Sequence, residues 1–95
     1  MSWLVVLRPV REEMPFEPTE EEVRIVGEHY AYLKRLHAEG RLVLAGPSAV
    51  PGDTFGLGIF DQHDRAEIEA IVAEDPAVTG GLMTAEIRPY RISVR

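Results

Sequence analysis

The sequence contains no cysteine, so disulfide bonds and thiolate metal sites are excluded. Basic residues are also scarce: 10 lysines and arginines stand against 16 aspartates and glutamates, which gives a net charge of −6. Binding to nucleic acid or to an anionic membrane surface needs a basic face, so both functions are disfavoured. The apolar start MSWLVVLRPV is too short for a secretory or membrane-spanning segment, and charged residues come directly after it. We therefore expect a cytoplasmic protein with neither a nucleic-acid nor a membrane partner.

The length and the hydrophobic content of the chain are sufficient for one folded domain. With 95 residues and 45% hydrophobic content, the chain predicts a single domain over residues 1–95. A chain this short buries a smaller fraction of its surface than a larger domain does, which favours support from a partner subunit.

Hydrophobic periodicity and turn residues predict six main elements. Short apolar runs predict strands at 3–10, 41–50, 54–61 and 82–95. Helical spacing predicts two helices, at 19–40 and 64–75. The stretch AVTGG at 77–81 predicts a loop.

The first helix carries clear signals at both ends. Thr19 and Glu22 form a capping-box pattern, and Gly40 suits the C-terminal cap. Ile25 and His29 lie on the flank of its predicted apolar stripe. The stripe itself consists of residues at helical spacing: Val23, Val26, Tyr30, Leu33 and Leu36.

The order β-α-β-β-α-β predicts an α+β, ferredoxin-like fold in which both helices cover one face of an antiparallel sheet. The runs at 3–7 and 42–45 are continuously apolar, which is typical of strands that are buried on both faces. Because helices of one chain cover only one face, we expect a second copy to cover the other. The sequence thus predicts a homodimer with sheet packed on sheet.

Two ionisable residues are candidates for catalysis. His29 lies at the edge of the helix face that meets the sheet, where an imidazole serves either as a hydrogen-bonded core residue or as an acid, base or ligand. Asp75 precedes Pro76, which pushes it out of the helical conformation at a helix end where an acid is unfavourable. Asp75 is either a solvated turn residue or is held there for His29, whose tautomer it would fix if the two meet.

The ordered set of motifs resembles the YCII (YciI-like) family. The resemblance rests on His29 ahead of Leu33, on GRLVLAGP at 40–47, and on the D-P-x-x-x-x-G corner from Asp75 to Gly81, with the pair Pro89-Tyr90 after it. It spans nearly the whole chain. Ala77 departs from the pattern, because an aromatic residue is frequent after Asp-Pro in the family.

This resemblance implies a dimeric α+β barrel with a His29–Asp75 dyad as its active site. It also implies a small-molecule enzyme that transfers protons, in an elimination, an isomerisation or a hydrolysis of a small polar or aromatic substrate. A relative is associated with the elimination of chloride from a chlorinated hydroxyquinol. The alternatives are a non-catalytic module that binds a small ligand, and a purely structural role for the pair.

Three further residues are assigned to substrate binding. Ser48 comes after the AGP turn, where it either is a turn residue or would complete a Ser-His-Asp set. Arg8 ends the first strand, where it either is solvated or would meet an anionic substrate. Tyr32 flanks His29 as a core or rim residue. His37 suits the last helical turn as a cation, and His63 falls in a loop. The histidine and acid spacings supply no third metal ligand and the glycines no phosphate loop, so we expect no metal and no cofactor.

Overall fold

The computed structural model describes residues 1–61 and 64–95, so the loop expected at His63 lies outside the described residues. The elements occur in the order β1 (Ser2–Pro9), α1 (Glu20–Ala38), β2 (Leu42–Val50), β3 (Asp53–Phe60), α2 (Arg65–Ala73), α3 (Pro76–Thr79) and β4 (Met83–Tyr90). This order agrees with the predicted β-α-β-β-α-β arrangement except for α3.

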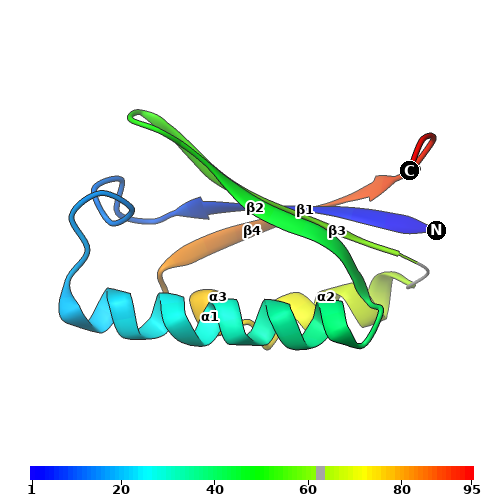
Figure 1. Ribbon diagram of the computed structural model, residues 1–95, viewed down its shortest axis with the longest axis horizontal. Helices are drawn as coiled ribbons and strands as arrows, with labels where there is room; N and C mark the ends of the chain where they lie inside the picture. Colours follow the sequence, from blue (N-terminus) through cyan, green and yellow to red (C-terminus); the bar gives the residue numbers. More distant parts are fainter. Residues whose placement is uncertain (62–63) are drawn as a thin grey trace.

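The four strands form one antiparallel sheet in the order β2-β3-β1-β4. The three helices of the described residues lie on one side of this sheet, and the described residues place no helix on the opposite side (Figure 1). The predicted α+β, ferredoxin-like fold is confirmed. Pro89 lies in β4, which is an edge strand, as expected for a residue without a backbone donor.

The helix ends agree with the local signals of the sequence. Thr19 accepts a hydrogen bond from the Glu22 backbone, and the Glu22 side chain accepts one from the Thr19 backbone. Gly40 has a φ of 77°, the left-handed conformation that ends helices. Asp64 caps α2 through a hydrogen bond from the Glu67 backbone.

The predicted buried stripe of α1 is wrong in part. Val23 and Tyr30 are 57% and 46% exposed. The buried residues of the helix are instead Ile25, His29, Tyr32 and Leu36. The helix is thus rotated relative to the prediction, and part of the predicted stripe, including Val26 and Leu33, lines an open cavity instead of the closed core.

The prediction of a loop at 77–81 is also wrong for its first residues, 77–79, which are helical. Residues Pro76–Thr79 form the one-turn helix α3, and Asp75 is its N-cap with a hydrogen bond of 2.9 Å from the Ala77 backbone. Pro76 takes the first helical position, where a missing N–H costs nothing. Asp75 therefore begins a new helix, and its carboxylate lies at the favourable end of α3.

The core lies between the sheet and the helices. Side chains alternate along β1, so that Trp3, Val5 and Leu7 face the helices and are buried. Leu4 and Val6 face the opposite side and are only partly buried. Half of each apolar run in the strands is therefore left on the open face of the sheet.

Candidate functional site

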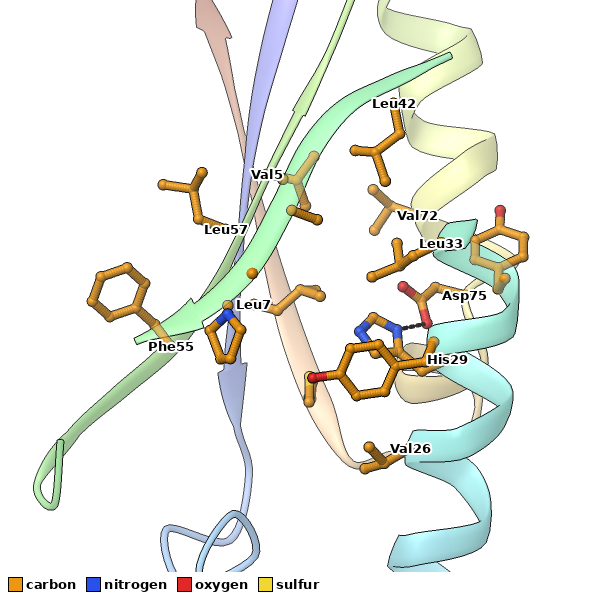
Figure 2. A pocket seen from close by; sticks show the side chains of 18 of the residues that line it. Val5, Leu7, Val26, His29, Leu33, Leu42, Phe55, Leu57, Val72 and Asp75 are labelled. Carbon is orange, nitrogen blue, oxygen red and sulfur yellow. Dashed lines mark hydrogen bonds and ion pairs between the residues drawn. The ribbon is translucent and has the colours of Figure 1, made fainter. Parts of the chain in front are cut away.

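His29 and Asp75 form a direct side-chain contact between α1 and the start of α3. The distance between His29 Nδ1 and Asp75 Oδ1 is 2.7 Å, and the two residues are 7% and 5% exposed. The imidazole lies between α1 and the sheet, and the Asp75 carboxylate lies beside the ring (Figure 2). The structure thus answers the question that the sequence left open, because the two residues meet.

The pair depends on a close approach of α3 to α1. A Cβ atom added to Gly80, at the end of α3, would lie 3.1 Å from Cδ1 of Ile25 and 2.8 Å from the Pro76 carbonyl oxygen. Only a glycine lets the backbone after α3 come this near to α1. This contact holds Asp75 within reach of a side chain that is 46 residues away in the sequence.

The hydrogen bonds define which imidazole nitrogen faces the cavity. Asp75 Oδ1 accepts from the Ala77 backbone and, with the carboxylate ionised, from Nδ1–H of His29. The other ring nitrogen, Nε2, then carries the lone pair. Among the described residues no fully buried side-chain nitrogen or oxygen lacks a hydrogen bond, and Nε2 has no hydrogen-bond partner among them. Nε2 is therefore not fully buried, and His29 lines the cavity.

A cavity of about 610 Å³ lies beside the pair, between α1 and strands β1, β2 and β3. This volume suits a small organic molecule. The walls are mostly apolar, with Val5, Leu7 and Leu33 among them. Gly56 and Gly58 of β3 also line the cavity, on the face that the register assigns to the helices. Because they have no side chains there, the space above β3 stays open.

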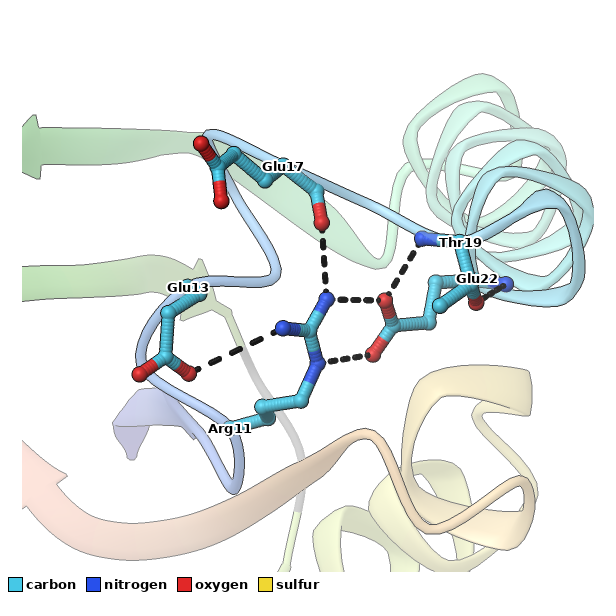
Figure 3. A network of polar contacts seen from close by, with 5 residues as sticks. All are labelled: Arg11, Glu13, Glu17, Thr19 and Glu22. Carbon is cyan, nitrogen blue, oxygen red and sulfur yellow. Dashed lines mark hydrogen bonds and ion pairs between the residues drawn. The ribbon is translucent and has the colours of Figure 1, made fainter.

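The loop between β1 and α1 closes one end of the cavity with Met14 and Pro15. Met14 is 4% exposed. Arg11 fixes this loop to α1 through two hydrogen bonds to the Glu22 carboxylate, of 2.6 and 3.1 Å, and one to the Glu17 carbonyl (Figure 3). The hydrogen bonds from Arg11 and from the Thr19 backbone lower the pKa of Glu22 to about 2.

Tyr32, assigned from the sequence to substrate binding, lies in the cavity wall, but its hydroxyl is already engaged. The hydroxyl donates a 2.6 Å hydrogen bond to the Ile71 carbonyl. Burial and the nearby Glu74 and Asp75 carboxylates raise the pKa of Tyr32. The phenol therefore stays protonated, and it is the ring of Tyr32 that the cavity offers to a ligand.

The structure does not bring Arg8 and Ser48 to this site. Ser48 pairs with Phe55 across β2 and β3, and the Arg8 guanidinium lies 5.8 Å from the centre of the Phe55 ring. Paired residues share a face of the sheet, so both lie on the open face. His29 and Asp75 lie on the opposite side. A Ser-His-Asp set within one chain is therefore ruled out.

Two ionisable residues of the cavity wall are not assigned to the site from the sequence. Lys34 and His37, both on α1, line the cavity. The place of His37 in the last helical turn explains a histidine there without any cavity. The signal that could have found both residues is their spacing of three, which puts them on one flank of the helix.

Two further features, a metal site and a membrane span, are not found among the described residues. Within 1–61 and 64–95 no group of three or more histidine or acidic side chains is placed to hold a metal ion. No helix in the same ranges is both long and apolar enough to cross a membrane.

The fold and site together define a ferredoxin-like α+β chain with a buried His–Asp pair beside a cavity. Residues 1–91 match the YCII-related domain, and the chain belongs to this family. The structure is similar to that of the 5-chloro-2-hydroxyhydroquinone dehydrochlorinase TftG from Burkholderia phenoliruptrix, in complex with 2,5-dihydroxybenzoquinone. The TM-score is 0.73 at 19% sequence identity, over 96% of this chain and 94% of that one. The sequence matches no curated protein.

Proposed function

We propose that the cavity is the active site of an enzyme that removes a proton from a carbon atom of a small substrate. The observation that carries the proposal is the 2.7 Å contact of Asp75 with Nδ1 of His29, which leaves the lone pair on Nε2 of a residue that lines the cavity. His29 is the general base in this scheme, and Asp75 is the positioning residue that fixes the tautomer.

The chemical step moves one proton and one electron pair. Nε2 of His29 takes the proton from carbon, and the C–H electron pair forms a new double bond. In an elimination, a leaving group departs with its own electron pair from the neighbouring carbon. In an isomerisation, the imidazolium returns the proton to a different carbon. Neither reaction needs an oxidant or a reductant.

The dehydrochlorinase similarity supports elimination, because the name of that protein states the loss of chloride from a hydroxylated ring. Hydrolysis through a serine nucleophile has no support, because Ser48 lies on the other face of the sheet. If the reaction is a hydrolysis, the nucleophile is therefore a water molecule that His29 activates.

The test measures proton abstraction directly. We would incubate the protein in D₂O with a panel of small carbon acids, which includes chlorinated dihydroxybenzenes, and monitor C–H exchange and chloride release by NMR and ion chromatography. Exchange is expected with the wild type and should be lost in His29→Gln, while Arg24→Gln on the same helix keeps it. If no compound exchanges, or if His29→Gln exchanges as fast as the wild type, the proposal is wrong.

The same experiments distinguish the two alternatives. A ligand that raises the melting temperature without any exchange would indicate a non-catalytic binding module. A purely structural pair would show no ligand effect, and replacing both His29 and Asp75 with apolar residues would lower the free energy of unfolding.

We also propose that the active form is a homodimer in which the open faces of two sheets pack together. Leu4, Val6, Leu57 and Ile59 form a partly exposed apolar band on that face, and Leu44 beside them is 51% exposed. A second copy would bury this band. Val6→Lys should yield monomers in analytical ultracentrifugation. Val94→Lys, at a position 91% exposed, is the matched control that keeps the dimer.

A further inference from the structure

The chain contains a single lysine, and this lysine lines the cavity. Lys34 lies on α1, one turn beyond Tyr30. It makes no ion pair or hydrogen bond with any described residue, whereas the arginines on the same helix, Arg24 and Arg35, pair with glutamates. The positive charge of Lys34 is therefore not neutralised within the described part of the chain.

The balance of charge inside the cavity differs from that of the whole protein. The chain has a net charge of −6, but Asp75 is the one acidic residue among the described residues that line the cavity. Its carboxylate already accepts hydrogen bonds from His29 and from the Ala77 backbone. Lys34 and His37, both exposed, thus line a cavity whose described walls hold no anion other than this buried carboxylate.

The helix sets the spacing between the charge and the base. Lys34 and His37 are three residues apart and lie on one flank of α1. Lys34 lies five residues beyond His29, which is about 7.5 Å along the helix axis at 1.5 Å per residue. A benzene ring with a charged substituent has a comparable length. Five residues also turn the helix so that the two side chains leave it about 140° apart. A ligand of this size therefore contacts both residues across the cavity that both of them line.

We propose that the cavity binds a small aromatic anion, with its ring among the apolar walls and its carboxylate on Lys34, assisted by His37. This inference rests on the proposed function, since it names the substrate class of the same site. Lys34 is then the residue that determines specificity, and it also sets which ring carbon comes to lie over His29.

The first experiment compares matched ligand pairs. We would measure by NMR titration the affinity of a panel of substituted benzoates, such as 2,5-dihydroxybenzoate, and of the corresponding neutral amides. The wild type should prefer each acid over its amide. Lys34→Gln should weaken acid binding about tenfold, as expected for a charge-assisted contact, and change amide binding less than about twofold. Lys34→Arg should retain most of the preference, and Arg24→Gln should retain all of it.

The second experiment uses the single lysine as a reporter. The variant Arg24→Lys has two lysine side-chain amines on the same helix. Reductive methylation followed by peptide mass spectrometry measures the methylation rate of each. Saturating 2,5-dihydroxybenzoate should slow methylation of Lys34 several-fold and leave the amine introduced at position 24 unaffected. Equal rates with and without the acid would contradict the proposal.

Three other results would overturn it. They are a panel in which no aromatic acid binds at millimolar concentration, acids and amides that bind the wild type equally, and a Lys34→Gln variant that weakens both classes alike. None of these readouts requires turnover. An intact acid preference without proton exchange would therefore refute the proposed function alone, and proton exchange on neutral compounds only would refute the anion proposal alone.

Discussion

Nδ1 of His29 lies 2.7 Å from Oδ1 of Asp75, and that same oxygen also accepts the Ala77 backbone N–H at 2.9 Å. One carboxylate oxygen thus orients the imidazole and caps α3. The hydrogen bond to the start of α3 fixes the position of the Asp75 carboxylate. The carboxylate in turn fixes the orientation of the His29 imidazole. Stability and site geometry are therefore linked at Asp75.

Asp75→Ala should lower the free energy of unfolding by about 2–4 kcal/mol, because it removes an N-cap and leaves a buried imidazole N–H without an acceptor. Asp75→Asn keeps a capping oxygen and an acceptor, so its loss should stay below about 1 kcal/mol. Urea denaturation measures both. Asp64→Ala, which removes only the cap of α2, is the control and should cost about 1 kcal/mol. Equal losses for the two Asp75 variants would contradict this role of the carboxylate.

Gly80→Ala should displace α3 from α1. The added Cβ would lie 2.8 Å from the Pro76 carbonyl oxygen and 3.1 Å from Ile25, so we expect a loss of about 1–3 kcal/mol from overpacking. The His29 ring signals should shift in the NMR spectrum because Asp75 moves with α3. Gly27→Ala on α1, where a Cβ meets nothing within 4 Å, should instead stabilise the protein by about 1 kcal/mol and leave those signals unchanged.

Gly56→Val should fill the cavity without harm to the strand. Its Cβ would lie at an ordinary contact distance of 3.7 Å from Leu7 Cβ, and valine favours a strand more than glycine does. We expect an unchanged or higher melting temperature and a loss of affinity of at least about tenfold for ring-sized ligands, measured by titration. Thr84→Val, on the open face, should leave affinity unchanged. Unaltered binding in Gly56→Val would place the ligand elsewhere.

The loop that closes the cavity should loosen in acid. The pKa of Glu22 is about 2 in the folded protein against an ordinary value of 4.5, so its contribution to stability is complete above about pH 4.5 and is lost as the pH falls toward 2. The stability difference between the wild type and Glu22→Gln should therefore shrink over that range. A difference that stays constant from about pH 5 to about pH 2.5 would show that Glu22 does not anchor Arg11.

Local signals predict most of the fold. Thr19, Asp64 and Gly40 each act within a few residues of a helix end, so the sequence alone determines their roles. The helix α3 is not predicted, because the proline at position 76 is as well suited to end α2 as to begin another helix. The packing of α3 against α1 decides between the two, and a local pattern holds no information on that packing.

The candidate site is only half predictable. His29 and Asp75 are identified through their residue types and the family motifs, but their contact depends on Gly80 packing against Ile25, which is a tertiary feature. Lys34 is not identified, because the rotation of α1 against the sheet decides which flank faces the cavity. The apolar stripe misleads the prediction, since part of it lines an open space and Tyr30 is nearly half exposed.

The glycines at 56 and 58 have a consequence for how this chain can diversify. Because glycine has no side chain, they leave room above β3, while the strand's hydrogen bonds come from the backbone. The His29–Asp75 pair comes from other elements, α1 and the start of α3. The size of the ligand that fits can therefore change by single substitutions that leave the His29–Asp75 pair intact. The shape of the cavity and the geometry of the pair are thus set by separate positions of the chain.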